Sequence, residues 1–309
     1  MTTLLVTHPD CLNHLTGPGH PERPDRLRAV EKALADARFA GLLRIESPLA
    51  ALETIGLCHP MDYVTRIRDA TPAQGVVRID ADTVMSPGSF NAALRCAGGA
   101  VLAVDHVLAR KAANAFVATR PPGHHAETAH AMGFCLFNNA AIAARHAQMQ
   151  HGLNRVAIVD FDVHHGNGTQ DIFWSDPTVL YCSTHEMPLY PGTGLPSERG
   201  AYDNIVNVPL RAGDGGTQFR DAMSSRILPR LNVFRPELLI ISAGFDAHHR
   251  DPLANLQLTE EDFGWATREL MAVADVSAGS RIVSVLEGGY DLEGLAQSAA
   301  AHVSALMSG

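Results

Sequence analysis

The chain has 309 residues, of which 46% are hydrophobic and 18% are charged, and its formal net charge is −9. This composition is that of a globular protein with a large core, and no linker or repeat divides it, so we expect a single domain over residues 1–309. The acidic charge and the lack of a basic cluster argue against direct nucleic-acid binding, and no apolar run is long enough to span a membrane.

The cysteines and the first residues predict a cellular compartment. Five cysteines are scattered along the chain without a Cys-x-x-Cys pair. An odd number in this arrangement is typical of reduced thiols and not of a disulfide framework. The opening residues, MTTLLVTHPD, do not have the pattern of a secretory signal. We therefore expect a cytoplasmic protein in which any metal is held by histidine and carboxylate ligands.

Apolar runs typical of strands alternate along the chain with stretches of helical spacing. In chain order, the predicted strands are 3–8, 115–119, 155–164, 178–185, 204–210, 237–244 and 281–289. The predicted helices are 89–110, 138–152, 217–234 and 258–275, and the last begins with a capping-box pattern at Thr259 and Asp262. Several strands are apolar at consecutive positions, which predicts an α/β fold with a mostly parallel central sheet. Ligands bind such sheets beyond the carboxyl ends of the strands.

The segment VDFDVHHGNG, residues 159–168, places four ionisable side chains at the end of an apolar run. Asp160, Asp162 and His164 share one face if the strand continues that far. Neighbouring carboxylates repel each other unless a cation lies between them, so we predict a divalent metal held by Asp162 and His164. A polar surface turn explains this segment equally well, because HHGNG is rich in turn-forming residues.

A second apolar run, IISAGFDAHHRDP at 240–252, contains a candidate third ligand, Asp246. Three protein ligands with one open position are typical of catalytic zinc. Two carboxylates and one imidazole also suit Fe(II), Co(II) or Mn(II). The alternative for Asp246 is a helix N-cap, which is common after a strand.

The segment ATRPPGHHAETAHAMGFC, residues 118–135, places His124 and His125 after a Pro-Pro-Gly turn. These histidines are candidate ligands or general bases, and the alternative is an exposed pair on a loop. A histidine base needs an acceptor that fixes its tautomer. Asp160 is free for this task if Asp162 binds the metal, and Asn167 is a weaker candidate.

The segment VLEGGYDLEG, residues 285–294, ends another apolar run in Gly288, Gly289 and Tyr290. The glycines allow a close approach of the backbone to a ligand. A tyrosine hydroxyl facing a metal-bound carbonyl is a good oxyanion donor. Gly-Gly-Tyr turns are common, so this segment is a weak signal by itself.

Together these segments resemble the histone deacetylase and acetylpolyamine amidohydrolase superfamily, in its class II-like branch. The matching blocks, in family order along nearly the whole chain, are HPERPDRL (20–27), SPGSFNAALRCAGGA (86–100), RPPGHHAETAHAMGFCLFNNAAIAA (120–144), VDFDVHHGNGTQDIF (159–173), YPGTG (190–194), SAGFDAHHRDPL (242–253) and LEGGYDL (286–292). Each block alone is a weak signal, but the seven blocks together are specific for this superfamily. The resemblance implies an arginase-like α/β fold, with a mostly parallel sheet of about eight strands flanked by helices.

The resemblance also implies the roles of the site residues. Asp162, His164 and Asp246 would bind one Zn²⁺, and His124 and His125 would lie beside the metal-bound water. Asp160 would accept a hydrogen bond from His124, and Asn167 from His125; many deacetylases have Asp at the latter position. An Asn cannot stabilise an imidazolium as Asp does, so the division of proton transfer between the two histidines stays open. Tyr290 would donate a hydrogen bond to the transition state.

The same resemblance implies a substrate channel and potassium sites. Phe134 and Tyr190 would form opposite walls of a narrow acyl-lysine channel, with Gly288 and Gly289 beside it and Leu253 at its mouth. Structural K⁺ would bind the backbone oxygens of Asp160, Asp162 and His164 together with Ser183 and Thr184. A farther K⁺ site matches Phe173, Asp176 and Val179, which equally well form a simple loop.

The implied activity is hydrolysis of an acetyl-lysine-like amide, or of another small acyl amide, to a free amine and a short carboxylate. Selective acetylpolyamine hydrolases often have a glutamate where this chain has Leu253, which disfavours that substrate. A two-Mn²⁺ ureohydrolase would need further aspartates after Asp246. A non-catalytic acyl-lysine-binding module is the alternative of another class, and Tyr290 argues against it. The expected partner is a small-molecule or acyl-lysine substrate, and a homo-oligomer is compatible with the sequence.

Overall fold

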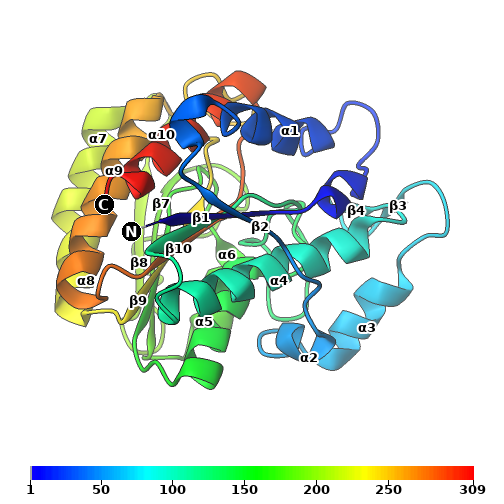
Figure 1. Cartoon of the computed structure of the whole chain (residues 1–309), viewed down its shortest axis with the longest axis horizontal. Helices are drawn as coiled ribbons and strands as arrows, with labels where there is room; N and C mark the ends of the chain where they lie inside the picture. Colours follow the sequence, from blue (N-terminus) through cyan, green and yellow to red (C-terminus); the bar gives the residue numbers. More distant parts are fainter. Residues whose placement is uncertain (1) are drawn as a thin grey trace.

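The core of the fold is a central sheet of eight parallel strands, seen in the computed structural model, which describes residues 2–309 (Figure 1). The strands are β1 (Thr3–Thr7), β2 (Leu43–Glu46), β5 (Asn114–Val117), β6 (Val156–Asp160), β7 (Val179–Glu186), β8 (Ile205–Leu210), β9 (Leu238–Ala243) and β10 (Ile282–Leu286). Their order across the sheet is β2-β1-β5-β10-β9-β6-β7-β8, and every neighbouring pair is parallel. A separate antiparallel hairpin joins β3 (Val77–Arg78) to β4 (Val84–Met85).

The predicted single α/β domain with a sheet of about eight strands is therefore confirmed. Each of the seven predicted runs overlaps one strand of this sheet. The eighth strand, β2, was not predicted because it is a short edge strand with mostly exposed side chains. The run at 155–164 forms a strand only to Asp160, so Asp162 and His164 lie in the turn that follows.

Helices cover both faces of the sheet. They are α1 (Pro24–Ala33), α2 (Leu52–Ile55), α3 (Met61–Asp69), α4 (Ser89–Leu108), α5 (Asn139–His151), α6 (Asn167–Phe173), α7 (Gly216–Ala222), α8 (Leu228–Phe234), α9 (Glu260–Ser277) and α10 (Leu292–Met307), with the shorter helical turns η1 (Pro9–Asn13), η2 (Ala37–Phe39) and η3 (Met223–Ile227). The predicted capping box is present at the start of α9, where the backbone N–H of Thr259 donates to Asp262 Oδ2 at 3.0 Å. The predicted helix over 217–234 is divided into α7, the π-turn η3 and α8. Pro229 lies in the first turn of α8, where a missing N–H is tolerated.

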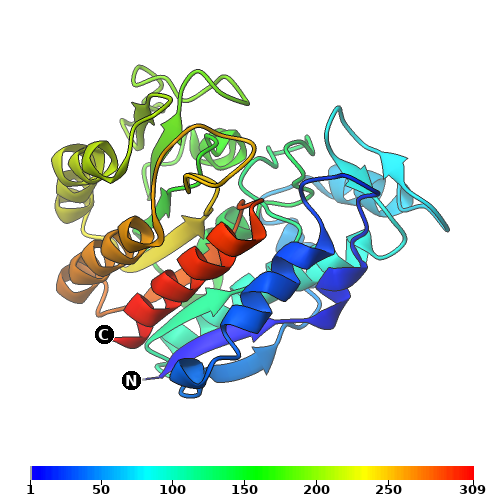
Figure 2. The same ribbon diagram turned by 90° about the horizontal axis from the view of Figure 1, so that it is seen from above.

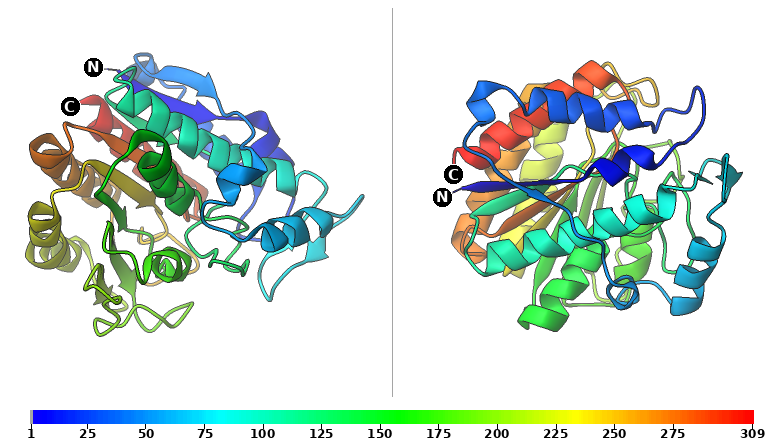
Figure 3. Two further views of the ribbon diagram at one scale, coloured as in Figure 1. Left: turned by 90° about the horizontal axis from the view of Figure 1, so that it is seen from below. Right: turned by 45° about the vertical axis from the view of Figure 1, so that its right-hand side comes forward.

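The two faces of the sheet have separate hydrophobic cores because alternate strand residues point in opposite directions. Leu4 and Val6 of β1 pack in the core beneath α4 and α5, whereas Leu5 packs in the core beneath α1, α9 and α10. Figure 2 shows α1 and α10 side by side on one face, and Figure 3 shows α4 and α5 crossing the other. No helix within residues 2–309 is both long and apolar enough to cross a membrane.

Candidate active site

The three predicted metal ligands converge at the carboxyl edge of two neighbouring strands. Asp162 and His164 follow β6, Asp246 follows β9, and these strands pair directly. His164 Nδ1 lies 3.2 Å from Asp162 Oδ1 and 3.1 Å from Asp246 Oδ2, and all three side chains are buried. One ligand atom from each residue lies within 4.8 Å of the others. The strand order, which brings β6 beside β9, is therefore what assembles this group.

The charges of this group favour a bound cation. Burial and the negative charge of Asp162 both raise the pKa of Asp246. Burial disfavours the His164 imidazolium, but hydrogen bonds and attraction from Asp162 and Asp246 outweigh it and raise the pKa of His164 to about 10. A proton on this imidazole thus takes the place of a positive ion between two buried carboxylates. Two carboxylates and one imidazole that demand a positive charge are a suitable donor set for Zn²⁺.

Gly288 closes the side of this group that faces β10. Its backbone N–H donates to Asp162 Oδ2 at 2.8 Å. A Cβ atom at this position would overlap the carboxylates of both Asp246 and Asp162. The predicted close approach of backbone to the ligand group is therefore present here, and only glycine fits it.

The tandem histidines lie in the loop that follows β5, and each contacts its predicted partner. His124 Nδ1 is 2.9 Å from Asp160 Oδ2, and His125 Nδ1 is 2.8 Å from Asn167 Oδ1. The two imidazole rings are 4.0 Å apart between centroids. Glu287 fixes the loop beneath them, since its Oε2 accepts the backbone N–H groups of Gly123 and His124 at 2.6 and 3.1 Å.

The two histidines differ in their electrostatic surroundings. Burial disfavours the charged form of His124, but the negative charges of Asp160 and Asp162 outweigh it and raise its pKa well above the usual range. Burial lowers the pKa of His125 well below the usual range, and the positive charges of His124 and His164 add to this effect. These surroundings favour the charged form of His124 and the neutral form of His125.

Tyr290 lies in the loop after β10 and is held from two sides. Its backbone N–H donates to Asp251 Oδ2 at 2.7 Å. The guanidinium of Arg26 lies 4.8 Å from the centre of its ring. The same guanidinium donates to the carbonyl oxygens of Glu287 and Gly289, at 2.5 and 2.6 Å. Burial raises the pKa of the Tyr290 phenol well above its usual value, so the hydroxyl keeps its proton.

A cavity of about 200 Å³ joins these groups. Its lining includes His125 and His164 at the ligand group, Tyr290, and the predicted channel residues Phe134, Tyr190 and Leu253. Phe134 and Tyr290 meet edge to face, with ring centroids 5.8 Å apart. The cavity is thus narrow and mostly aromatic, and it ends at the acidic ligand group.

Comparison with known proteins decides the family. The histone deacetylase domain matches residues 20–306 of this chain. The chain belongs to the histone deacetylase family. It is 40% identical over 278 residues to a histone deacetylase-like amidohydrolase of Pseudomonas aeruginosa, covering 88% of this chain and 73% of that protein. It is 39% identical over 325 residues to the human polyamine deacetylase HDAC10, covering 99% of this chain and 46% of that protein.

A crystal structure of the HDA15 HD domain superposes on this deacetylase fold with a TM-score of 0.94 at 36% identity, covering 99% of this chain and 88% of that one. Membership of the family confirms the prediction of a hydrolase that acts on non-peptide amide bonds.

The two glycines assigned to the channel of this deacetylase lie behind its wall. Gly288 and Gly289 are not among the residues that line the cavity. The N–H of Gly288 faces Asp162, and a Cβ at Gly289 would contact Leu295 and Phe245 of the hydrophobic core. These glycines therefore shape the ligand group and the Tyr290 loop without touching the channel.

The sequence analysis missed Asp82 and Leu189, which also line the cavity. Asp82 Oδ1 accepts the backbone N–H of Gly133 at 3.0 Å, and Thr83 Oγ1 accepts that of Phe134 at 3.0 Å. Burial raises the pKa of the Tyr190 phenol, and the nearby negative charge of Asp82 raises it further. The β3–β4 hairpin that carries Asp82 has no motif, and its only signal is the acid-rich stretch IDAD at 79–82.

Some residues of the two predicted potassium sites lie close together in the structure. Asp160 of β6 pairs in register with Ser183 of β7, so these two residues of the nearer predicted site lie on neighbouring strands. At the farther site, the carbonyl oxygens of Phe173, Asp176 and Val179 lie 2.8, 3.0 and 3.1 Å from Nδ2 of Asn204. Three backbone carbonyls of the farther predicted site therefore converge on the Asn204 amide.

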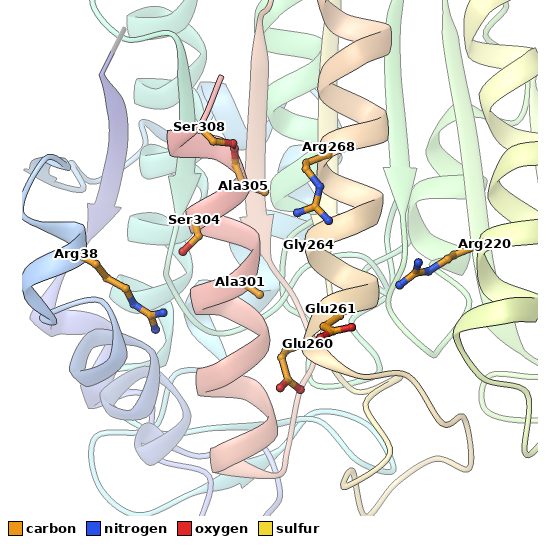
Figure 4. Close-up of a pocket in the computed structure, with 10 residues that line it drawn as sticks. All are labelled: Arg38, Arg220, Glu260, Glu261, Gly264, Arg268, Ala301, Ser304, Ala305 and Ser308. Carbon is orange, nitrogen blue, oxygen red and sulfur yellow. The ribbon is translucent and has the colours of Figure 1, made fainter.

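A larger surface hollow, of about 680 Å³, lies along α9 and α10 and is separate from this site (Figure 4). Its charged side chains are Arg38 from η2, Arg220 from α7, and Glu260, Glu261 and Arg268 from α9. Neither of the two groups of potential metal ligands found within residues 2–309 lies in it. The hollow therefore lacks the convergent ligands of the deacetylase site.

Proposed function

We propose that the chain is a zinc-dependent deacetylase that hydrolyses an acetyl-lysine-like amide to a free amine and acetate or another short acid. The observation that carries this proposal is the buried group of Asp162, His164 and Asp246 at the end of a narrow cavity, with Tyr290 and His125 beside it. A bound Zn²⁺ would polarise the substrate carbonyl and acidify a water molecule.

His125 is the proposed general base and acid. A general base must be neutral before it accepts a proton. Its lowered pKa makes His125 the neutral ring of the pair, and its ring lines the cavity. Asn167 Oδ1 accepts the Nδ1 proton, which leaves Nε2 free to take a proton from the attacking water and return it to the departing amine. His124, paired with Asp160, supplies positive charge beside the reaction.

Tyr290 is the proposed oxyanion donor. Its protonated hydroxyl belongs to the cavity lining, close to the ligand group. The ring is fixed by Arg26 and by the edge of Phe134, so little reorganisation is needed when charge develops on the carbonyl oxygen. An intact donor also favours an enzyme over an acyl-lysine-binding module.

The cavity favours a substrate with a slender aliphatic chain. Phe134, Tyr190 and Leu253 offer apolar walls, and the volume of about 200 Å³ suits one such chain better than a bulky acyl group. Asp82 supports a second candidate, an acetylated polyamine, because it places one carboxylate among the lining residues. Leu253 disfavours that substrate, as the sequence resemblance implies. The turnover of acetyl-lysine peptides and of acetylated polyamines should therefore be compared directly.

The test is a turnover panel on zinc-loaded protein with acetyl-lysine peptides, acetylated polyamines and small neutral amides. We expect kcat/KM to be highest for acetyl-lysine peptides and turnover to stop when a chelator removes the metal. The matched variant is Asp246→Asn, which keeps the shape of the side chain and removes one ligand charge. Turnover that persists in this variant or in chelated wild-type protein would refute the proposal.

Potassium at the two predicted sites and a cytoplasmic location are part of the same proposal. All five cysteines are buried free thiols, which suits a reducing compartment. Activity that rises with K⁺ at constant ionic strength, relative to Na⁺, would support the structural ion. No direct contact with nucleic acid or membrane is proposed, and gel filtration would show whether the chain forms the homo-oligomer that its sequence is compatible with.

A further inference from the structure

A second group of metal-ligating side chains lies on the surface between two helices. Asp105 near the end of α4 faces His146 and His151 of α5. Nε2 of each histidine lies 2.7 Å from the same atom, Oδ1 of Asp105. The two rings are 5.6 Å apart between centroids. Three potential ligands from two helices therefore point at one small volume.

We propose that Asp105, His146 and His151 form a second site for a divalent transition-metal ion, which joins α4 to α5. Two imidazoles and one carboxylate are the donor set that Zn²⁺, Cu²⁺ and Ni²⁺ favour, whereas Mg²⁺ and Ca²⁺ prefer oxygen ligands alone. Three protein ligands leave at least one coordination position for water.

The side chains are arranged for an ion that arrives from solvent. The Asp105 side chain is 47% exposed and that of His151 30%, so the common point is accessible. The His146 side chain is only 12% exposed, so its ring is largely held in place before an ion binds. Burial disfavours the Asp105 carboxylate, but hydrogen bonds from both imidazoles outweigh it and lower its pKa, so the carboxylate is charged.

Ion binding at this group needs only a local exchange of protons and contacts. Without an ion, each ring donates its Nε2 proton to Asp105 Oδ1. With an ion, each neutral ring carries its proton on Nδ1 and offers the Nε2 lone pair to the metal. Hydrogen-bonded pairs on an exposed surface contribute little to stability, so their loss is a small cost.

The second site is independent of the deacetylase centre. Both helices run back towards the amino ends of the strands that follow them, because α4 leads into β5 and α5 leads into β6. Asp105 and His151 lie at those ends of the helices, whereas the deacetylase ligands follow the carboxyl ends of β6 and β9. Figure 3 shows α4 and α5 side by side on their face of the sheet. An ion here would connect these helices without touching the substrate cavity.

The test measures bound zinc in the full chain without a polyhistidine tag, after equilibrium dialysis against an excess of Zn²⁺. The test variant is His146→Ala with His151→Ala. The matched control is His106→Ala, because His106 is next to Asp105 on α4 but bonds its own helix at the carbonyl of Leu102. We expect the test variant to bind one zinc ion fewer per chain than the wild type and to keep wild-type kcat/KM. The control should bind as much zinc as the wild type.

Equal zinc content in the test variant and the wild type would overturn this inference. Circular dichroism must show that the test variant is folded, and the single variant His151→Ala, whose side chain is more exposed than that of His146, provides the comparison if it is not. A second readout uses Cu²⁺ and electron paramagnetic resonance. We expect a signal split by two imidazole nitrogens that disappears in the His146→Ala, His151→Ala variant, and the same signal in that variant would also overturn the assignment. Neither readout depends on deacetylase activity.

Discussion

Glu22 is the anion at the centre of a buried cationic group, and we predict that its replacement by glutamine strongly destabilises the protein. Glu22, Arg26 and Arg120 are each 0% exposed. Both oxygens of Glu22 accept from Arg120, at 2.6 and 2.5 Å, and Oε1 also accepts from Arg26 at 3.1 Å. The substitution leaves two buried guanidinium groups without this counter-charge.

The cost of Glu22→Gln follows from this geometry. Removing one partner of a buried ion pair typically costs about 3–5 kcal/mol, because the remaining charge stays buried. Domains are stable by only about 5–15 kcal/mol, so the variant should lose a large part of its unfolding free energy. Arg26 also holds the carbonyl oxygens of Glu287 and Gly289 beside Tyr290, so we expect kcat of the folded variant to fall as well.

The loss of unfolding free energy in Glu22→Gln should depend on pH. Burial disfavours the Glu22 carboxylate, but the positive charge of Arg120 outweighs it and holds the pKa of Glu22 well below the usual range. A group with a depressed pKa in the folded state contributes stability that is present above its unfolded pKa, about 4.3, and lost as the pH falls through the folded pKa. The difference between wild type and Glu22→Gln should therefore be largest near neutral pH and shrink in acid.

The assay is urea unfolding of both proteins across this pH range, with Asp25→Asn as the matched control on α1. Asp25 pairs with Arg28 at 2.9 Å on the exposed surface, where such pairs contribute about 0–1 kcal/mol. A Glu22→Gln variant that loses no more unfolding free energy than this control would refute the reasoning. A loss that stayed constant from neutral to acidic pH would refute its electrostatic part.

Four further predictions concern the site and the core. Tyr290→Phe should lower kcat/KM by about two to three orders of magnitude and leave the zinc content unchanged; a smaller effect would remove the tyrosine from the oxyanion role. Gly288→Ala should weaken zinc binding by about 10-fold or more, measured by chelator competition, because the added Cβ overlaps two ligand carboxylates, and unchanged affinity would contradict that packing. Asp82→Asn should raise KM for an acetylated polyamine more than for a neutral amide of similar length, and equal changes would exclude attraction by this carboxylate. Burial lowers the pKa of His302 to about 3, so the free energy of unfolding should fall as the pH drops below about 6.5, by at most about 1.4 kcal/mol per pH unit. In urea titrations, a His302→Gln variant should lose less unfolding free energy per pH unit in acid than the wild type. An equal loss in both proteins would show that His302 does not cause this pH dependence.

The sequence predicted which candidate metal ligands would lie together because each follows an apolar run. The carboxyl ends of parallel strands meet at one edge, so polar residues after such runs are expected to lie close together. The pattern of Asp162, His164 and Asp246 therefore indicated the group before the strand order was known. What the pattern could not give was the end of β6 at Asp160, since local apolar character continues to Val163.

The supporting residues were harder to predict because their partners are distant in sequence. Glu22 and Arg26 belong to the block HPERPDRL, which carried the family resemblance without indicating a role. Arg120 is 98 residues from Glu22, and the Gly289 carbonyl is 263 residues from Arg26. Asp82 lies on a hairpin of two-residue strands, outside any periodic pattern. Such contacts depend on the complete topology, which no local segment encodes.

The position of β10 has a consequence for synthesis on the ribosome. This last strand of the sequence lies between β5 and β9, so it alone joins the three strands β2-β1-β5 to the four strands β9-β6-β7-β8. Until β10 leaves the exit tunnel, the two parts of the sheet on either side of it stay unjoined, and each has an open central edge that can recruit another chain. A truncated translation product that lacks β10 would therefore be prone to aggregation, and chaperone demand should be highest just before β10 emerges.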